Sequence, residues 1–349
     1  MNETWVTIGL GLVFIAVLVA PFLIKRVEAN LELFLFVMGL IASTIAAAWS
    51  LHLVEEALVE PIKITVTVLA AGLVFHFFRH QIRVGVGVAV HRVSFRGFIF
   101  LLVVLLGFLS SVISAIVAAL VLVEAVSAID VPRRSSIRLV VMGCFAIGMG
   151  AALTPLGEPL STIAIAKLSG EPYHADFFFL FNLLGKFVIP GVIALGLATV
   201  VLVGKHQHGV QGLVAAEKSE RLAHVFVRAA KVYLFVMALI FLGTGFKPLI
   251  DLYFINIPSP VLYWVNSMSA VLDNATLTAA EIGPNLTQLQ IEAALMGLLI
   301  AGGALIPGNI PNIISASKLK ISSREWAQVG LPVGLVVMAV FFVAVFVRG

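Results

Sequence analysis

Residues 150–159 read Gly150-Ala-Ala-Leu-Thr-Pro-Leu-Gly-Glu-Pro159 and lie inside a long apolar stretch. Proline removes a backbone amide donor and glycine adds backbone freedom, so we expect a helix here to unwind about residues 154–158, at Pro155 and Gly157. Pro159 is suited to the first turn of the half-helix that follows. Unwound backbone at membrane depth survives only inside protein or beside a watery cavity, where its free carbonyls can bind cations.

The same pattern returns as Gly302-Gly-Ala-Leu-Ile-Pro-Gly-Asn-Ile-Pro311, which predicts a matching break at Pro307, Gly308 and Pro311. A packing kink would explain either break by itself. Two matched breaks favour a functional interpretation.

Composition places these breaks in a membrane protein. The chain has 349 residues, of which 61% are hydrophobic and 11% are charged, whereas soluble domains average about 45–50% apolar and about 25% charged residues. We therefore expect an all-α polytopic membrane protein, with the first apolar stretch retained. The predicted full crossings, about eight, are residues 5–24, 30–53, 62–78, 139–167, 176–203, 224–246, 292–317 and 326–347.

Several function classes are disfavoured by what the sequence contains. Its single cysteine, Cys144, lies in an apolar run, so a thiolate metal cluster is excluded. The Lys and Arg residues fall in short loops, which indicates topology and not nucleic-acid binding. The sequence has no phosphate-binding loop and no nucleophile elbow, so we expect a protein that is not an enzyme and has no cofactor.

Residues 97–123 and 249–280 carry polar side chains in mid-stretch, and we interpret both as re-entrant hairpins. With the amino terminus outside, this arrangement places most basic loops inside, as the positive-inside rule requires. The acidic residues expected in outer loops are Glu55, Glu56, Glu60, Glu171, Glu281 and Glu292.

Span, hairpin, broken span and span then occur twice, in residues 62–203 and 224–349. Each copy makes three crossings, so the second is inverted relative to the first, a pattern found in secondary transporters. Residues 1–61 supply two extra spans, which we assign to a scaffold, and residues 204–223 form a cytoplasmic linker.

Asp273 is the leading candidate ion ligand because an ionisable group within a membrane is expensive and usually functional. It is followed by Asn274, Thr276 and Thr278. We expect Asp273 and Asn274 to bind sodium, helped by backbone carbonyls near Pro307 and by Asn309 and Asn312. Burial raises the pKa of such an acid and a bound cation lowers it, so a proton and sodium would compete. A local hairpin cap is the alternative role.

Glu158 is a second acid at expected midplane depth, with Thr154, Ser161 and Thr162 nearby in sequence. Its alternative role is to cap the half-helix that starts at Pro159. The hydroxyls of the first hairpin, Ser110, Ser111 and Ser114, are further candidate ligands.

Lys186 lies within a predicted span and is expected to neutralise Glu158 or Asp273 in the empty state, with snorkelling to the surface as the alternative.

Ser269-Ala-Val-Leu-Asp-Asn-Ala-Thr-Leu-Thr-Ala-Ala280 resembles the Asp-Asn-x-x-Leu-Thr-Ala segment of D-type sodium/proton antiporters of the ion transporter superfamily. Residues 304–315 resemble their second broken helix, and a closer resemblance is to the DUF1646 group of predicted cation transporters. The resemblance covers roughly residues 62–347 and implies a homodimer in which a transport domain slides against a scaffold. The first hairpin lacks the Ser-Asn-Thr motif of the superfamily's dicarboxylate carriers, which disfavours a carboxylate substrate.

Three function classes follow from these residues. We expect a sodium/proton antiporter in the prokaryotic inner membrane, whose partners are small ions, lipid and a second copy. A coupled carrier of a carboxylate or of an oxyanion such as arsenite is the main alternative, and a channel or intramembrane enzyme is the third.

Overall fold

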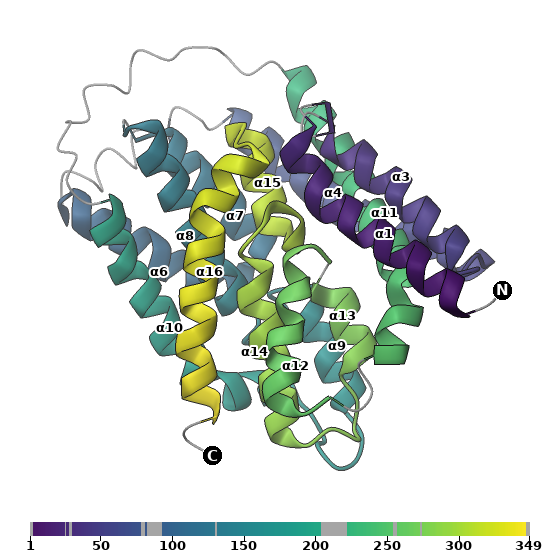
Figure 1. The fold of residues 1–349 in the computed structure, drawn as a ribbon. Helices are drawn as coiled ribbons and strands as arrows, with labels where there is room; N and C mark the ends of the chain where they lie inside the picture. The colour runs from purple at the N-terminus through teal and green to yellow at the C-terminus, as the bar shows by residue number, and fades with distance from the viewer. Residues whose placement is uncertain are drawn as a thin grey trace.

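The computed structural model of this chain describes residues 3–24, 26–27, 30–77, 81, 93–129, 131–203, 222–253, 257–272 and 274–346. Within these ranges the regular structure is entirely helical, as Figure 1 shows, which confirms the all-α prediction. Five helices are long and apolar enough to cross a membrane, namely Phe95–Ile113, Arg133–Ala151, Phe179–Val203, Val225–Leu249 and Ser323–Phe346. These features are those of a polytopic membrane protein.

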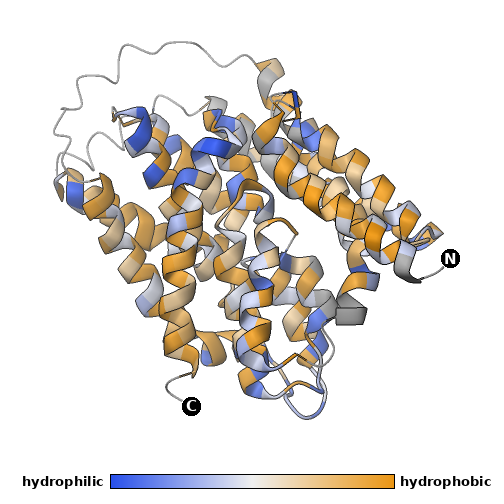
Figure 2. Ribbon diagram, in the orientation of Figure 1, coloured by the Kyte–Doolittle hydropathy of each residue, from blue (hydrophilic) through white to orange (hydrophobic). Residues whose placement is uncertain are grey.

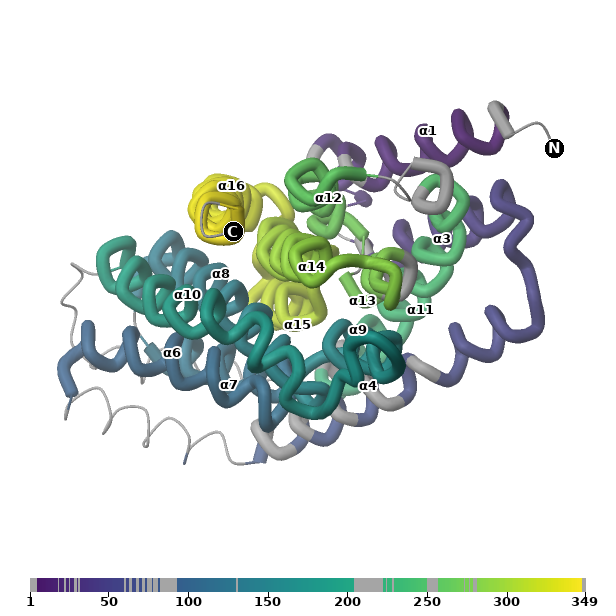
Figure 3. Tube along the Cα trace, turned by 90° about the horizontal axis from the view of Figure 1, so that it is seen from below, coloured from purple at the N-terminus to yellow at the C-terminus, as the bar shows by residue number. Residues whose placement is uncertain are grey.

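Four helices pack together along one side of the molecule, and we call them the peripheral unit (Figures 1 and 3). They are α1 (Glu3–Leu23), α3 (Leu31–Ile45), α4 (Leu51–Phe77) and α11 (Leu222–Tyr253). Small residues bring α3 and α11 close together, because a Cβ added to Gly39 would lie 2.8 Å from Phe241 Cβ.

The remaining helices form what we call the central unit. Its first half comprises α6 (Phe95–Ile113), α7 (Ala115–Ser127), α8 (Arg133–Ala151), α9 (Pro159–Leu168) and α10 (Phe179–Val203). Its second half comprises α12 (Ser259–Val265), η2 (Asn266–Ala270), α13 (Asn274–Glu281), α14 (Gln288–Gly302), η3 (Ile306–Gly308), α15 (Ile310–Leu319) and α16 (Ser323–Phe346).

Helices α6 and α7 form a hairpin whose turn is Ser114, a residue with a φ angle of 73°. Ala115 N donates a hydrogen bond of 2.8 Å to the carbonyl oxygen of Gly157, which lies in the segment that follows α8. Leu122, further along α7, contacts Gly143 in the middle of α8. The chain therefore folds back along α8 after Ser114.

The α12–η2–α13 segment makes a second hairpin, which packs on α14. Ser269 and Asn274 both approach Gly302 at the end of α14, whereas Asn266 bonds to Ala294, two turns earlier. Glu281, at the end of α13, lies near Asn266 again. The chain thus folds back near Asn274.

Several predicted boundaries were wrong, including the start of the second hairpin at residue 249, which falls inside α11. The division between residues 61 and 62 falls inside α4, because Pro61 is accommodated within the helix and the preceding Glu55 and Glu56 are exposed on it. Loss of one amide donor did not end the helix. The predicted span 30–53 ends instead at Ile45, where α3 stops.

Most residues of α10 and of the lower part of α16 are hydrophobic, as Figure 2 shows. On α16, Leu335, Val336 and Val340 are 59%, 63% and 60% exposed. Exposed apolar side chains of this kind suit contact with lipid acyl chains.

Candidate functional site

The first break separates α8 from α9, and the tip of the first hairpin closes it. Thr154 Oγ1 donates to Ser111 O at 2.5 Å, and Gly157 O accepts from Ala115 N at 2.8 Å. Gly150 lies so near α6 that an added Cβ would be 1.7 Å from Gly107 O. The break is therefore held by contacts with the backbone of the hairpin, one of which is made by the Thr154 side chain.

The hydroxyl groups that were predicted to bind an ion near this break form hydrogen bonds with backbone groups. Ser161 Oγ donates to Ala151 O at 3.5 Å, and Thr162 Oγ1 donates to Pro155 O at 2.7 Å. Ser110 Oγ lies 2.6 Å from Gly107 O and 3.0 Å from Ile147 O. Ser114 Oγ accepts from Val117 N at the start of α7. These side chains hold the unwound chain in shape.

Glu158 is buried and immediately precedes α9. Its side chain makes no capping hydrogen bond to the amides of α9, so the capping role weighed from the sequence is limited to the charge of the carboxylate. A buried acid at the positive end of a helix remains electrostatically favoured.

The second break separates α14 from α15, and Asn312 holds it together. Asn312 Nδ2 donates to Gly302 O and to Leu305 O, each at 2.8 Å. The hairpin tip lies against this break, because a Cβ on Gly308 would be 2.6 Å from both Gly302 O and Ser269 O. Carbonyl oxygens from both sides of the break therefore gather around Gly302 and Gly308.

Two amide groups in this region have a buried polar atom without a hydrogen bond among the described residues. They are Asn274 Nδ2 and Asn312 Oδ1. The Nδ2 atom of Asn274 lies 3.7 Å from the position of a Cβ on Gly302. Buried polar atoms are nearly always satisfied in folded proteins, so each of these two atoms can accommodate a further hydrogen-bond partner.

The two breaks adjoin each other in the middle of the central unit. A Cβ on Gly148, just before the first break, would lie 2.8 Å from Asn309 Nδ2 in the second. One turn earlier on α8, Cys144 Sγ donates to Ser315 Oγ of α15 at 3.3 Å. Asn309 is buried and makes no side-chain cap on α15. The structure thus brings predicted residues of both halves together.

Two predicted ligands cannot be placed. Asp273 lies outside the described residues, as does the side chain of Thr276. Thr278 is buried and its Oγ1 donates to Asn274 O at 2.8 Å.

The expected partner of Lys186 was wrong. Lys186 Nζ binds Glu292 Oε1 at 2.8 Å, and the lysine side chain is half exposed. Glu292 is ten residues before Gly302 on α14, roughly 15 Å along the helix from the second break. The lysine charge is therefore compensated away from both breaks, and Glu292 is not a solvated loop residue.

The structure also shows two polar features that the sequence argument missed. Glu124 and Lys318 form a buried ion pair of 2.7 Å between α7 and α15. Asn274, Thr278 and Glu281 follow an i, i+4, i+7 pattern and so share one face of α13. That spacing was visible in the sequence and would have identified Glu281.

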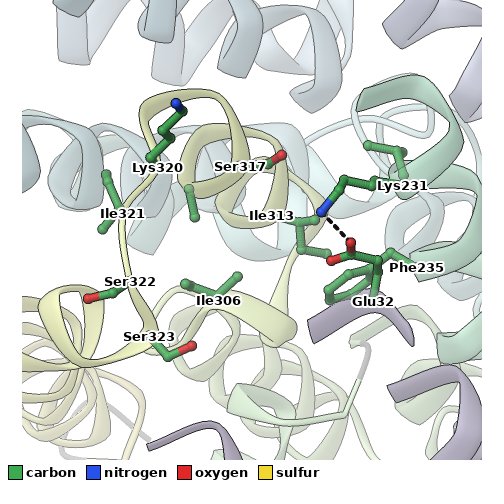
Figure 4. A pocket seen from close by; sticks show the side chains of 12 residues that line it. Glu32, Lys231, Phe235, Ile306, Ile313, Ser317, Lys320, Ile321, Ser322 and Ser323 are labelled. Atoms are coloured by element: carbon green, nitrogen blue, oxygen red, sulfur yellow. Dashed lines mark ion pairs between the residues drawn. The ribbon is translucent and has the colours of Figure 1, made fainter. Parts of the chain in front are cut away.

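A cavity of about 300 Å³ lies between the peripheral unit and the α15–α16 turn (Figure 4). Its wall includes Ile306 of the second break and Ile313 of α15. Glu32 and Lys231 line it from the peripheral unit and form an ion pair. The cavity extends to the second break from the end of the molecule that carries Lys320.

Comparison with known proteins places this chain in a family. No curated protein matches the chain. The family model described as "Protein of unknown function (DUF1646)" matches residues 7–348, nearly its whole length. The chain therefore belongs to the DUF1646 family.

Proposed function

We propose that this protein is a secondary active transporter that exchanges sodium ions for protons. The observation that carries the proposal is the meeting of two interrupted helices in a buried centre, with Gly148 of α8 against Asn309. Each interruption is closed by its own hairpin tip, through Ser111 on one side and Ser269 on the other. Amide, hydroxyl and carbonyl oxygens at such a place are the ligands that hard cations prefer.

The architecture is proposed to be a pair of inverted repeats, residues 62–203 and 224–349, with two re-entrant hairpins and about eight crossings. In support, a hairpin, an interrupted helix and a long helix occur in the same order in both halves of the central unit. Figure 1 has α9 below the centre and α15 above it, as an inverted relation requires. The amino terminus is proposed to lie outside a prokaryotic inner membrane.

In the proposed cycle, Asp273 and Asn274 bind sodium together with carbonyl oxygens near Gly308. A proton competes for the Asp273 carboxylate, because either cation neutralises a charge that is costly in an apolar setting. The cavity beside Ile306 gives access from the inner side. The peripheral unit serves as the scaffold, and the central unit moves against it within a homodimer.

A coupled anion carrier is the second candidate, and one observation favours it. The amino end of α15 has no side-chain cap, and the neutral Asn309 precedes it. Such an end attracts anions. Asn274 Nδ2 is also a donor without a partner among the described residues. At the first break, in contrast, Glu158 already provides a negative charge before α9.

Transport by the purified protein in liposomes tests the proposal. A sodium gradient should drive proton movement, read with a pH-sensitive dye inside the liposomes, and lithium, potassium, a dicarboxylate and arsenite are offered in parallel. Asp273→Asn keeps the side-chain shape but removes the charge, so it should abolish sodium-driven proton movement in a folded protein. Asp176→Asn, at an exposed loop position, is the matched control.

Uptake of an anion without sodium-driven proton movement would replace the antiporter by the carrier. Exchange by Asp273→Asn at the parental rate would remove Asp273 from the site and leave the exchange itself established.

A further inference from the structure

A buried carboxyl group lies outside both breaks, at the end of α13. Both carboxyl oxygens of Glu281 are shielded from solvent, and neither has a hydrogen-bond partner in the described part of the chain. The residue directly follows the predicted hairpin 249–280, where a solvated outer-loop acid was expected, and it belongs to none of the five helices long enough to span. An ionised carboxylate is poorly accommodated in such surroundings, whereas a protonated one can act as a donor.

The acceptor for such a donor is Asn266. This side chain is fully buried, and its Nδ2 donates to Ala294 O at 3.1 Å, which fixes the orientation of the amide. Its Oδ1 is buried and has no hydrogen-bond partner among the described residues. Gly297 permits this packing, because an added Cβ would lie 3.0 Å from Asn266 Cβ. Three acceptor atoms in the same small region therefore have no donor among the described residues.

Burial raises the pKa of Glu281 to about 8, and a hydrogen bond donated by Asn266 to the carboxylate opposes this rise. Asn266 Nδ2 already donates to Ala294 O, so the atom that this amide leaves for the Glu281 carboxyl is the acceptor Oδ1. Helices α9, α11 and α14 pack against α13. The charged side chains described on these three helices are Lys167, Lys231, Lys247 and Glu292. Lys231 is paired with Glu32, and Glu292 is paired with Lys186. The pKa of the Glu281 carboxyl is shifted by burial and by Asn266, and not by a neighbouring charge.

Glu281 is connected to the second break by polar groups. Thr278 and Asn274 lie on the same face of α13, and Thr278 Oγ1 bonds to Asn274 O. On the other arm of the hairpin, in η2, Ser269 follows Asn266 by three residues, and its Oγ donates to Leu298 O at 3.1 Å. These polar side chains thus extend from Glu281, at the end of α13, to the carbonyls around Gly302.

We propose that Glu281 is a proton-binding site of this protein, that it is protonated in the present conformation, and that its carboxyl O–H donates to Asn266 Oδ1. The site deepens the sodium/proton exchange proposed above, because it provides the proton with a carboxyl group distinct from the sodium ligands. Its existence does not depend on that exchange and can be measured without it.

Infrared spectroscopy of the full-length protein in liposomes tests the proposal, with pH raised from about 5 to about 10. The carbonyl band of a protonated carboxyl should disappear as pH passes about 8. Glu281→Gln, which has nearly the same shape, should lack that titrating band. Glu171→Gln changes an exposed glutamate and should retain it. An unchanged band in Glu281→Gln overturns the proposal.

Asn266→Ala provides a second measurement that leaves the acid in place. Loss of the acceptor should move the Glu281 band to higher frequency, and an unmoved band would contradict the assigned hydrogen bond.

The pH dependence of thermal unfolding gives an independent readout. The pKa of Glu281 is raised from 4.5 to about 8 by folding. Its contribution to stability is fully present below pH 4.5 and is lost as pH rises to about 8. The decline in unfolding temperature across this window should be smaller in Glu281→Gln than in the parent and the Glu171→Gln control. Equal declines in all three would contradict the proposal.

Absence of sodium/proton exchange in liposomes would refute the proposed function alone and would leave the proton-binding site at Glu281 unaffected.

Discussion

Single side chains hold the unwound backbone of this protein in place. In the first break Thr154 anchors the chain to the carbonyl of Ser111, and in the second Asn312 bridges two carbonyls of its own break. Backbone groups freed from a helix must find partners when they are buried. Each break therefore depends on a few polar side chains that bond at fixed positions.

Replacing Asn312 tests this dependence. Asn312→Leu removes the donors to Gly302 O and Leu305 O, and each buried carbonyl left without a partner costs about 1–3 kcal/mol. We expect a lower unfolding temperature in detergent. Asn182→Leu makes the same chemical change at an exposed position of α10 and should have little effect. Equal stability of the two variants would show that Asn312 does not hold the break.

Residue-level signals predict some of these features and not others. Pro155, Gly157 and Pro159 act on their own backbone, so the first two lie in the interval between Ala151 and α9 and Pro159 begins α9. The pairing of Lys186 with Glu292 joins residues 106 apart in sequence and depends on how α10 packs on α14. Such a pairing is not encoded in a local pattern.

Close helix packing fixes the elements around each break. Gly150 and Gly107 bring α8 against α6. Gly303, in the second break, packs against Phe145 of α8. The sequence indicated small residues near the breaks but not which helices they join. Likewise, the serines of residues 97–123 indicated a hairpin, but its tip is placed by the φ angle of 73° at Ser114 and its return arm extends to Ser127.

A methyl group at position 150 tests this packing. Gly150→Ala would place Cβ 1.7 Å from Gly107 O, so α6 and α8 must separate, and overpacking of this kind costs about 1–3 kcal/mol or more. We expect a lower unfolding temperature and poorer recovery of folded protein. Gly11→Ala is the matched control, because a Cβ there meets nothing within 4 Å in the apolar helix α1. A Gly150→Ala protein as stable as Gly11→Ala would contradict the close approach of the two helices.

At the scale of the whole molecule, the sequence predicts the class of protein but not how its helices are grouped. Composition alone predicted an all-helical polytopic chain, because so many apolar side chains cannot be buried in one water-soluble core. The division into peripheral and central units was not predicted, since the boundary at residue 61 falls inside α4 and α11 packs with α3 and α4. The assignment of sides remains a prediction from the distribution of Lys and Arg.

Labelling of single cysteines in a Cys144→Ala background tests that assignment. Positions 130 and 205 should react from the inner side, and Glu56 and Asn285 from the outer side, because basic residues flank the first pair. An even number of crossings between 130 and 205 requires both to face the same side. Reaction of these two positions from opposite sides would overturn the topology.

Labelling at position 113 tests whether the first hairpin is re-entrant, since α6 has 19 residues and is long enough to cross fully. Ile113 ends α6 beside the Ser114 turn. A re-entrant hairpin predicts that Ile113→Cys resists an impermeant reagent added outside, whereas labelling as fast as at position 56 would make α6 a full crossing.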